Sequence, residues 1–513
     1  MPEQEVDAGA PVHADGAVPA GLLDAFWRYE RALMADDVPE LDALFTDGPS
    51  TLRGDAGGLL VGHDAIAAFR RGRGGAPKRR IAAVHVRVLG DDAAVVVAEL
   101  APRTGGRGQQ TQVWRRGAVG WQVLVAHVAN PAPAVDARIW RTVGTPLVRG
   151  AAEGPLVGKR LAVKDLFAVA GHRIGAGVPE YLAHAVVQQH TAPSVRALLE
   201  AGADLTGIAH TDEFAYSIAG ANPHHGTPPN ARVPGALPGG SSSGPASAVA
   251  LGQADIGLAT DTGGSIRVPA SYQGLWGLRT THGRIARKGL LPLAPSFDTI
   301  GWLTRDRAVL AACSRVSAVG APAVPAPDRF VTAPGLLAGL DGTVRRAFEA
   351  WTHRLGDVGQ VDLGDVAAAQ EAFRVVQAHE AWQADGAWLT AHPGAVSGAV
   401  AARFEAAADV LDEEADLARF ELEDHRRRFT RALQGAVLLL PSAASVAPQA
   451  TADAAAVDAV RTQTLRLTCV AGILGAPALS APLLEIGGAP LGVCLVGPRH
   501  SDDALIHLAA SLR

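Results

Sequence analysis

Apolar residues recur at helical spacing near the start of the chain. Between residues 22 and 45 they return every three or four positions, the period of an amphipathic helix. The segment DDVP at residues 36–39 interrupts this pattern, so we expect two helices that part there. A third short helix is predicted over residues 62–70.

The apolar pattern then shortens to the alternation that is typical of β-strands. Four segments alternate in this way and are separated by turns rich in Gly and Asp. They cover residues 81–89, 93–100, 109–115 and 121–128. Helices followed by an antiparallel meander predict an α+β domain that ends near Asn130.

The composition changes after Asn130. The segment NPAPAV at residues 130–135 is a natural linker, and an α/β pattern of short apolar strands, Gly-rich turns and Ala-rich helices follows it. Two of these helices are predicted over residues 193–201 and 395–414. The predicted division is a flexible tail (1–19), an α+β domain (20–130), a linker (131–139) and an α/β domain (140–513).

Charge and hydropathy exclude several classes of partner. Basic and acidic residues nearly balance, 46 against 51, which argues against a nucleic-acid partner. The first twenty residues contain no Lys or Arg, so we expect no secretory signal. Three prolines and a glutamate break the apolar stretch at residues 471–497, which disfavours a membrane span. These features predict a cytoplasmic protein without a membrane partner.

The three cysteines predict neither a disulfide framework nor a metal site. Cys313, Cys469 and Cys494 are scattered among apolar neighbours and form no ligand spacing. We expect them to be small buried residues in a reducing compartment.

Two glycine-rich loops with serines carry the candidate chemistry. They read PGGSSSG at residues 238–244 and DTGGSIR at residues 261–267. In the second loop, glycines let successive backbone N–H groups converge, so Ser265 could attack a carbonyl carbon while these amides hold the oxyanion. The candidate oxyanion donors are the backbone amides of Thr262, Gly263, Gly264 and Ser265. Asp261 and Arg267 are expected to pair and hold this loop.

A lysine upstream of both loops is the candidate base. Lys164 lies in the apolar segment LAVKDLF at residues 161–167, where desolvation would lower its pKa toward neutrality. Taken alone, the loop at Ser265 could be an ordinary Gly-rich turn, and Lys164 could be a surface residue paired with Asp165. The combination with the serine loops favours acyl transfer.

Histidine-based schemes fit the sequence less well. No G-x-S-x-G elbow surrounds Ser241 or Ser265, and no His/Asp pair stands at a recognisable spacing. We expect supporting or loop roles for His210, His224, His225 and His282.

The two loops and the lysine together resemble the amidase signature family, over about residues 140–513. The resemblance implies a Ser-Ser-Lys triad in which Lys164 is the base, Ser241 follows a cis peptide bond and relays the proton, and Ser265 is the nucleophile. It also implies a supporting role for Ser242, no metal and no organic cofactor. The implied α/β fold is a mixed, largely parallel sheet flanked by helices.

Two positions depart from this family's pattern. Pro245 stands where Gly or Ser is common, and it suits the first position of a helix. The region after Phe330 is shorter than in longer members. In the family, that region usually lines the substrate pocket. The substrate of a relative is therefore a poor guide to the substrate of this chain.

The N-terminal segments YERAL at 29–33, GHDAI at 62–66 and VAHV at 125–128 are similar to the AtzH-like subgroup of SnoaL-like, cone-shaped α+β domains. Such folds often associate through their sheet, so a homodimer is predicted. Four side chains could line a pocket in the cone, although core packing is favoured: Trp114, Trp121, His85 and His127.

The segment TDEFAYS at residues 211–217 is similar to the indole-3-acetamide hydrolase branch. Phe214 and Tyr216 are therefore candidate substrate-binding residues, with core packing as the alternative. A small primary amide of the arylacetamide type is the favoured substrate. The alternatives are a ureido or biuret-like compound, an amidotransferase subunit that needs a partner, and a non-catalytic interaction protein.

Overall fold

The computed structural model divides into two compact units, which meet in sequence between Val135 and Asp136. It describes residues 9–55, 58–73, 76, 79–102, 108–129, 135–318, 324–325, 327 and 329–512. The boundary lies within the predicted linker, of which residues 131–134 lie outside the described part. Ile139, at the end of that predicted linker, is fully buried and belongs to the second unit.

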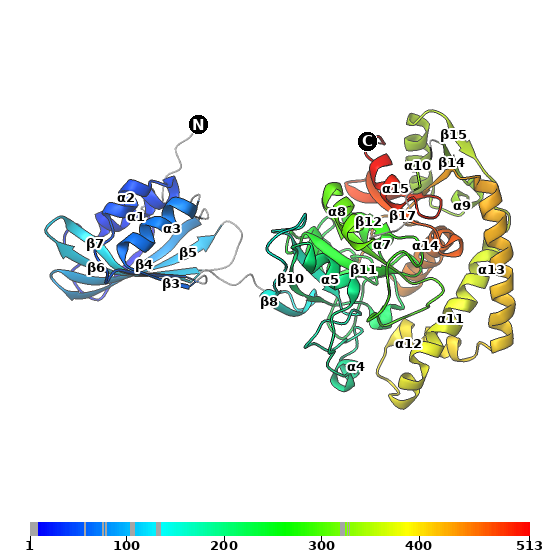
Figure 1. The fold of residues 1–513 in the computed structure, drawn as a ribbon, viewed down its shortest axis with the longest axis horizontal. Coiled ribbons are helices and arrows are strands. Elements are labelled where there is room, and N and C mark those ends of the chain that lie inside the picture. The colour runs from blue at the N-terminus through cyan, green and yellow to red at the C-terminus, as the bar shows by residue number, and fades with distance from the viewer. Residues whose placement is uncertain are drawn as a thin grey trace. The chain divides into compact units, whose positions relative to one another are not determined.

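The N-terminal unit combines three helices with one sheet, drawn in blue and cyan in Figure 1. The helices are α1 (Leu22–Ala35), α2 (Val38–Ala43) and α3 (His63–Arg73). The described strands are β1 (Val12–Ala14), β2 (Leu52–Asp55), β3 (Gly58–Val61), β4 (Arg79–Gly90), β5 (Ala93–Pro102), β6 (Gly108–Gly117) and β7 (Gly120–Ala129). Their order in the sheet is β1-β4-β5-β6-β7-β2-β3.

The predicted meander is present, because β4 to β7 pair antiparallel in sequence order. Residues 1–8 of the predicted flexible tail (1–19) lie outside the described residues, and the prediction is wrong in one segment of the remainder. Residues 12–14 form β1 and pair parallel with β4. Three residues are too few to show a period in sequence, and the neighbouring strand supplies the hydrogen bonds that order them. The short hairpin of β2 and β3 escaped prediction for the same reason.

The core of this unit contains the aromatic side chains that could have lined a pocket. Trp114 is completely buried and Trp121 nearly so, and both pack in the same apolar cluster as Tyr29. His127 is exposed, and His85 lies 3.0 Å from the carboxylate of Glu99. The two tryptophans therefore stabilise the core, as favoured from the sequence.

The second unit is built on one mixed sheet flanked by helices. Its described strands are β8 (Trp140–Val148), β9 (Arg160–Lys164), β10 (Asp204–Ala209), β11 (Ile256–Asp261), β12 (Trp276–Arg279), β13 (Thr299–Thr304), β14 (Phe330–Thr332), β15 (Val358–Gln360), β16 (Val437–Pro441), β17 (Ala478–Ile486) and β18 (Ala489–Val496). Their order is β15-β14-β16-β18-β17-β12-β13-β11-β9-β10-β8.

The predicted mixed sheet is confirmed, but parallel pairing does not dominate it. Among the described strands, four neighbouring pairs are parallel and six are antiparallel. The parallel pairs include β9 with β10 and with β11. The β17–β18 pair is antiparallel because a tight turn joins the two strands and reverses the chain.

The helices of this unit are interspersed with the strands along the chain. They are α4 (Pro179–His184), α5 (Pro193–Glu200), the 3₁₀ turn η1 (Glu213–Ala215), α6 (Ser243–Ala250), α7 (Arg267–Gln273), α8 (Arg307–Ser317), α9 (Pro334–Leu337), α10 (Gly342–Arg354), α11 (Val366–Ala391), α12 (Gly398–Ala408), α13 (Asp412–Leu433), α14 (Ala454–Leu474) and α15 (Asp502–Leu508). Helix α11 packs against α12, α13 and α14 (Figure 1). No helix among the described residues has the length and apolar character that crossing a membrane requires.

Two helix predictions need correction. The single helix predicted over residues 395–414 is α12 followed by the start of α13. A new helix starts after Leu411, whose N–H donates to the Glu414 carboxylate, as in the start of a capped helix. Helix α6 begins at Ser243, so Pro245 stands at its third position rather than its first.

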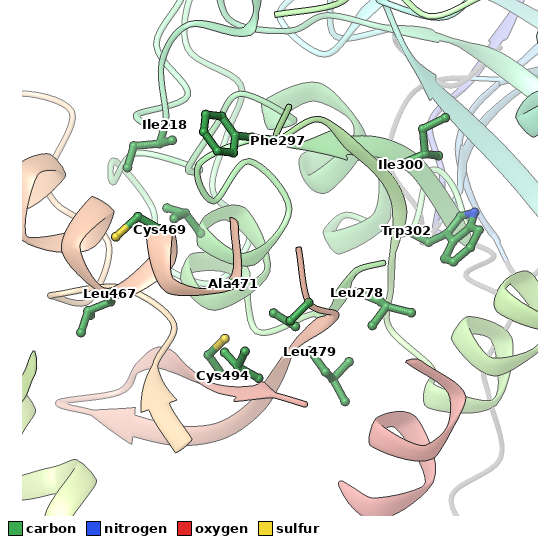
Figure 2. Close-up of a cluster of buried hydrophobic side chains, with 14 of the residues drawn as sticks. Ile218, Leu278, Phe297, Ile300, Trp302, Leu467, Cys469, Ala471, Leu479 and Cys494 are labelled. Carbon is green, nitrogen blue, oxygen red and sulfur yellow. The ribbon is translucent and has the colours of Figure 1, made fainter. Parts of the chain in front are cut away.

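The core beside the site joins sheet and helix side chains. Figure 2 shows Leu278 of β12, Trp302 of β13, Leu479 of β17 and Ala471 of α14 in one apolar cluster. Cys469 and Cys494 are buried in the same region, and Cys313 is buried in α8. This packing fixes the strand ends from which the polar side chains of the site project.

Candidate active site

The carboxyl ends of β9 and β11 bring the candidate base to a serine. The two strands run parallel, so Lys164 at the end of β9 and Thr260 near the end of β11 lie at the same edge of the sheet. Lys164 Nζ lies 2.8 Å from Ser241 Oγ and 2.8 Å from Thr260 Oγ1. All three side chains are buried. The sequence did not single out Thr260, because only the pairing of the strands places it beside the lysine.

The environment of Lys164 favours its neutral form. Burial lowers the pKa of Lys164 to about 7, against the opposing effect of the Asp212, Asp261 and Asp298 carboxylates. A neutral amine has a free electron pair and can accept a proton from Ser241. The alternative of a surface lysine paired with Asp165 is wrong, because Asp165 pairs instead with Arg141 at 2.9 Å.

Asp212 supports the loop that contains Ser241. The Gly240–Ser241 peptide bond is cis, as the family resemblance implied. The Asp212 carboxylate accepts hydrogen bonds from the Gly220 N–H at 2.9 Å and the Ser243 hydroxyl at 3.0 Å. A Cβ at Gly240 would lie 2.3 Å from an Asp212 oxygen, so only glycine fits there.

Two neighbouring threonine and serine side chains complete this support. The Thr211 hydroxyl donates to the Ser241 carbonyl at 2.8 Å, and the Ser242 hydroxyl donates to the Thr260 carbonyl at 3.3 Å. Ser242 therefore ties its loop to β11, in agreement with the expected supporting role.

The loop of Ser265 is organised by a buried carboxylate. Asp261 forms the expected pair with Arg267 and also contacts Arg279, with nitrogen–oxygen distances of 2.8 and 3.1 Å. Although burial alone would raise the pKa of the Asp261 carboxyl, these two guanidinium groups hold it below its usual range. The Asp261 carboxylate is therefore a fixed negative charge at the start of the loop.

One of the predicted oxyanion donors is already occupied. The Gly264 N–H donates to Asp261 Oδ1 at 3.0 Å, so the prediction that its amide binds the oxyanion is wrong. The carboxylate shapes the turn by taking this amide. The amides of Thr262, Gly263 and Ser265 remain the candidates. On the other side, the Thr468 hydroxyl donates to the Gly263 carbonyl at 2.6 Å and fixes the turn.

Ser265 opens onto a small hollow. The Ser265 hollow is lined by residues of the loop at 261–267, by residues 215–218 and by side chains of α11 and α14, among them Gln377 and Arg461. No hydrogen bond joins the Ser265 and Ser241 hydroxyls within the described residues. In free enzymes such contacts often form only when substrate binds.

The histidines fill supporting positions. His210 and His225 stack at 3.7 Å between ring centroids, and burial lowers the pKa of His210 to about 3. His224 lies 2.8 Å from the Glu213 carboxylate, and His282 from the Pro295 carbonyl at 2.9 Å. Among the described residues, one group could hold a metal ion, since its possible ligand atoms lie within 4.8 Å of one another: Glu180, His184 and His392.

Comparison with known proteins agrees with this geometry. The family model described as Amidase matches residues 134–332, and the model described as AtzH-like matches residues 13–132. The chain is similar to Amidase 1 of Arabidopsis thaliana, with 36% identity over 397 residues that cover 70% of this chain and 93% of that protein. The chain belongs to the amidase signature family. It is an amide-hydrolysing enzyme with an AtzH-like N-terminal domain.

Two further relatives of this amidase bear on its fold and substrate. A solved structure titled "Crystal structure of amidase" matches with a TM-score of 0.63 and 30% identity, and the match covers 73% of this chain and 91% of that chain. The 1-carboxybiuret hydrolase subunit AtzE of Pseudomonas sp. (strain ADP) is 42% identical over 159 residues, which cover 30% of this chain and 33% of that protein.

The two predicted substrate-binding residues of the amidase lie in different surroundings. Phe214 is buried, and its ring packs against Tyr181, Trp388 and Phe404 with centroid distances of 5.2 to 5.9 Å. This ring stabilises the core, which was the alternative reading. Tyr216 lines the Ser265 hollow.

A larger pocket adjoins the hollow of the amidase. This arginine pocket, of about 320 Å³, is lined by Tyr216 and by residues of α11, α12 and α14. It includes three arginines: Arg374, Arg403 and Arg461. None of these arginines was predicted from the sequence, because isolated arginines on helices carry no local signal of a pocket. The Amidase model ends at residue 332, before all three helices.

Proposed function

We propose that this amidase cleaves a small primary amide to a carboxylate and ammonia through an acyl-enzyme on Ser265. The observation that carries the proposal is the 2.8 Å contact between Lys164 Nζ and Ser241 Oγ, in a buried setting that lowers the pKa of the lysine to about 7. A buried neutral amine beside a hydroxyl is a base and its relay.

In the first half of the reaction, Ser241 passes its proton to Lys164 as it takes the proton of Ser265. Ser265 Oγ then bonds to the amide carbon, and the carbonyl oxygen becomes an oxyanion. Backbone amides at Thr262, Gly263 and Ser265 stabilise that charge. The relay returns the proton to nitrogen, the carbon–nitrogen bond breaks and ammonia leaves.

In the second half, water attacks the ester carbon of the acyl-enzyme. The water gives its proton to the same relay, and the proton returns to Ser265 Oγ as the carbon–oxygen bond breaks. The carboxylate product leaves and the free enzyme is restored. No step in this scheme uses a metal or an organic cofactor.

Arylacetamides are the first substrate class that we propose. The arginine pocket next to Ser265 includes the aromatic side chains of Tyr216 and Phe373 and the apolar side chain of Leu465. Such walls suit the flat ring of an arylacetamide, in which one methylene group separates the ring from the scissile carbonyl.

A ureido compound is the second candidate. It is supported by the AtzH-like domain and by the similarity to a 1-carboxybiuret hydrolase subunit. In this case the same relay would act on a carbon that carries two nitrogens.

The decisive experiment is ammonia release by the wild type and by Ser265→Ala. The panel contains indole-3-acetamide, phenylacetamide, aliphatic amides, biuret and glutamine. We expect release from at least one amide and a loss of at least about 10⁴-fold in kcat/KM for Ser265→Ala, because the nucleophile is gone. Ser511→Ala, in an exposed serine near the C-terminus, is the control and should retain full activity.

The pattern of release distinguishes the alternatives. Release from biuret alone would replace the arylacetamide proposal by the ureido one. Release that persists in Ser265→Ala would exclude Ser265 as the nucleophile. Absence of release from every compound would favour a subunit that needs a partner. The homodimer and the cytoplasmic location stay predictions, and sedimentation velocity tests the first.

A further inference from the structure

The arginine pocket and the Ser265 hollow are parts of one binding region. They share four lining residues: Tyr216, Gln377, Arg461 and Leu465. When the amide carbon of a substrate lies at Ser265, the remote end of that substrate can therefore lie in the arginine pocket. The shared Arg461 stands where the two spaces meet.

The charges that line the arginine pocket do not balance. Its lining contains three arginines and one glutamate, so the formal charge is 3 − 1 = +2. Arg374 is neutralised by that glutamate, because two of its nitrogens donate to the Glu371 carboxylate at 2.8 and 2.6 Å. The excess positive charge therefore belongs to Arg403 and Arg461.

These two arginines have weak anionic partners. They share one carboxylate, that of Asp458, with nitrogen–oxygen distances of 3.9 Å for Arg403 and 3.8 Å for Arg461. The Asp458 side chain is 63% exposed, and solvent screens such a contact. Arg461 Nε is buried and lacks a hydrogen-bond partner within the described residues.

The position of Arg403 is nevertheless fixed. Its guanidinium donates to the Tyr216 carbonyl at 2.9 Å, which holds α12 to the loop that walls the Ser265 hollow. Burial lowers the pKa of Arg461 to about 10 and also lowers the pKa of Arg403. A bound anion would relieve this cost of burying two cations.

We propose that Arg403 and Arg461 bind a carboxylate of the substrate, so that the enzyme acts on small amides that carry a carboxylate group at the end remote from the scissile bond. Guanidinium groups recognise a planar carboxylate through paired N–H donors. The apolar walls of the pocket would contact the carbon skeleton between the carboxylate and the amide. This inference rests on the proposed function and specifies the charge of its substrate.

Matched substrates that differ in the carboxylate test the proposal. Glutaramic acid is compared with pentanamide, and 4-carboxyphenylacetamide with phenylacetamide. We expect the wild type to favour the carboxylated member of at least one pair by about 10- to 100-fold in kcat/KM, since hydrogen bonds to charged groups are worth that factor. Equal or lower kcat/KM for both carboxylated amides would overturn the proposal.

Arginine variants assign the preference to residues. Arg461→Met and Arg403→Met should each lower the ratio of kcat/KM for the carboxylated amide to kcat/KM for the neutral amide by about 10-fold or more. Arg374→Met should have a much smaller effect because Glu371 already neutralises Arg374. Arg461→Lys keeps the charge, so it should recover part of the loss. An undiminished preference in both Met variants would overturn the assignment.

A binding measurement separates this inference from the proposed function. Calorimetry with Ser265→Ala and glutarate requires no turnover, and it is repeated in the Arg461→Met background. Binding that is weakened about 10-fold or more by Arg461→Met supports the anion site even if every amide fails as a substrate. Turnover of neutral amides together with no glutarate binding would overturn the anion site and leave the amidase proposal intact.

Discussion

Lys164 can act as a base only while its amine is neutral. Burial lowers its pKa to about 7, so the lysine becomes protonated below that pH and loses its free electron pair. We expect kcat/KM for amide hydrolysis to rise about tenfold per pH unit below pH 7 and to level off above it. Rate measurements between about pH 5 and pH 9 test this profile. A flat profile down to pH 5 would mean that another group is the base.

Thr260 is the residue that the sequence did not reveal as part of the site. Its hydroxyl lies 2.8 Å from Lys164 Nζ and fixes the amine beside Ser241. Thr260→Val keeps the shape and removes one hydrogen bond, so we expect kcat/KM to fall about 5- to 10-fold. Thr260→Ser retains the hydroxyl and is the matched control. A loss in Thr260→Ser together with none in Thr260→Val would indicate that packing of the methyl group, rather than the hydrogen bond, is what matters.

At the scale of elements, β11 joins the two halves of the site. Its carboxyl end carries Thr260 and Asp261, and the loop that follows it leads to α7. Asp261 also accepts hydrogen bonds from the N–H groups of Gly264 and Ile266, so one carboxylate fixes both the strand end and the loop. The strand therefore sets the position of Ser265 relative to the lysine.

Asp261→Asn should destabilise the second unit strongly. The substitution removes the charge that compensates two buried guanidinium groups, which costs about 3–5 kcal/mol. Asp255→Asn, just before the same strand, is the control, because Asp255 pairs with the half-exposed Arg160 and Arg305 and its loss should cost no more than about 1 kcal/mol. Urea denaturation measures both values. Equal stability of the two variants would contradict the role of Asp261.

The whole molecule consists of two units whose apolar cores are separate. The cluster that contains Trp114 lies entirely in the N-terminal unit, and the remaining clusters lie in the second. The lysine, both serines and the arginine pocket belong to the second unit. Stability changes in one unit should therefore leave the chemistry of the other unaffected.

Trp114→Ala tests this independence. Loss of a fully buried tryptophan should cost about 3–5 kcal/mol in the N-terminal unit. We expect calorimetry to show a lower melting temperature for one transition only, with ammonia release unchanged at temperatures below it. A parallel shift of both transitions, or loss of activity with the fold intact, would show that the two units are coupled.

The sequence by itself determined the features that depend on neighbours along the chain. The strand alternation of residues 93–100 and the helix of residues 193–201 follow from local periodicity, and β5 and α5 match them closely. Lys164 and the two serine loops were found because the glycines and hydroxyls that the chemistry needs stand together in short segments. The pair of Asp261 with Arg267 is also local, since six residues separate the two.

Only the tertiary structure decided what depends on contacts between distant segments. Phe214 was open to a role in the core or in a pocket until rings from α4, α11 and α12 enclosed it. Arg403 meets Tyr216 across 187 residues of sequence, and no local period records such a contact. Chemistry carried by one loop is therefore legible in the chain, whereas the charge and shape of the substrate pocket arise from helices that meet only in the fold.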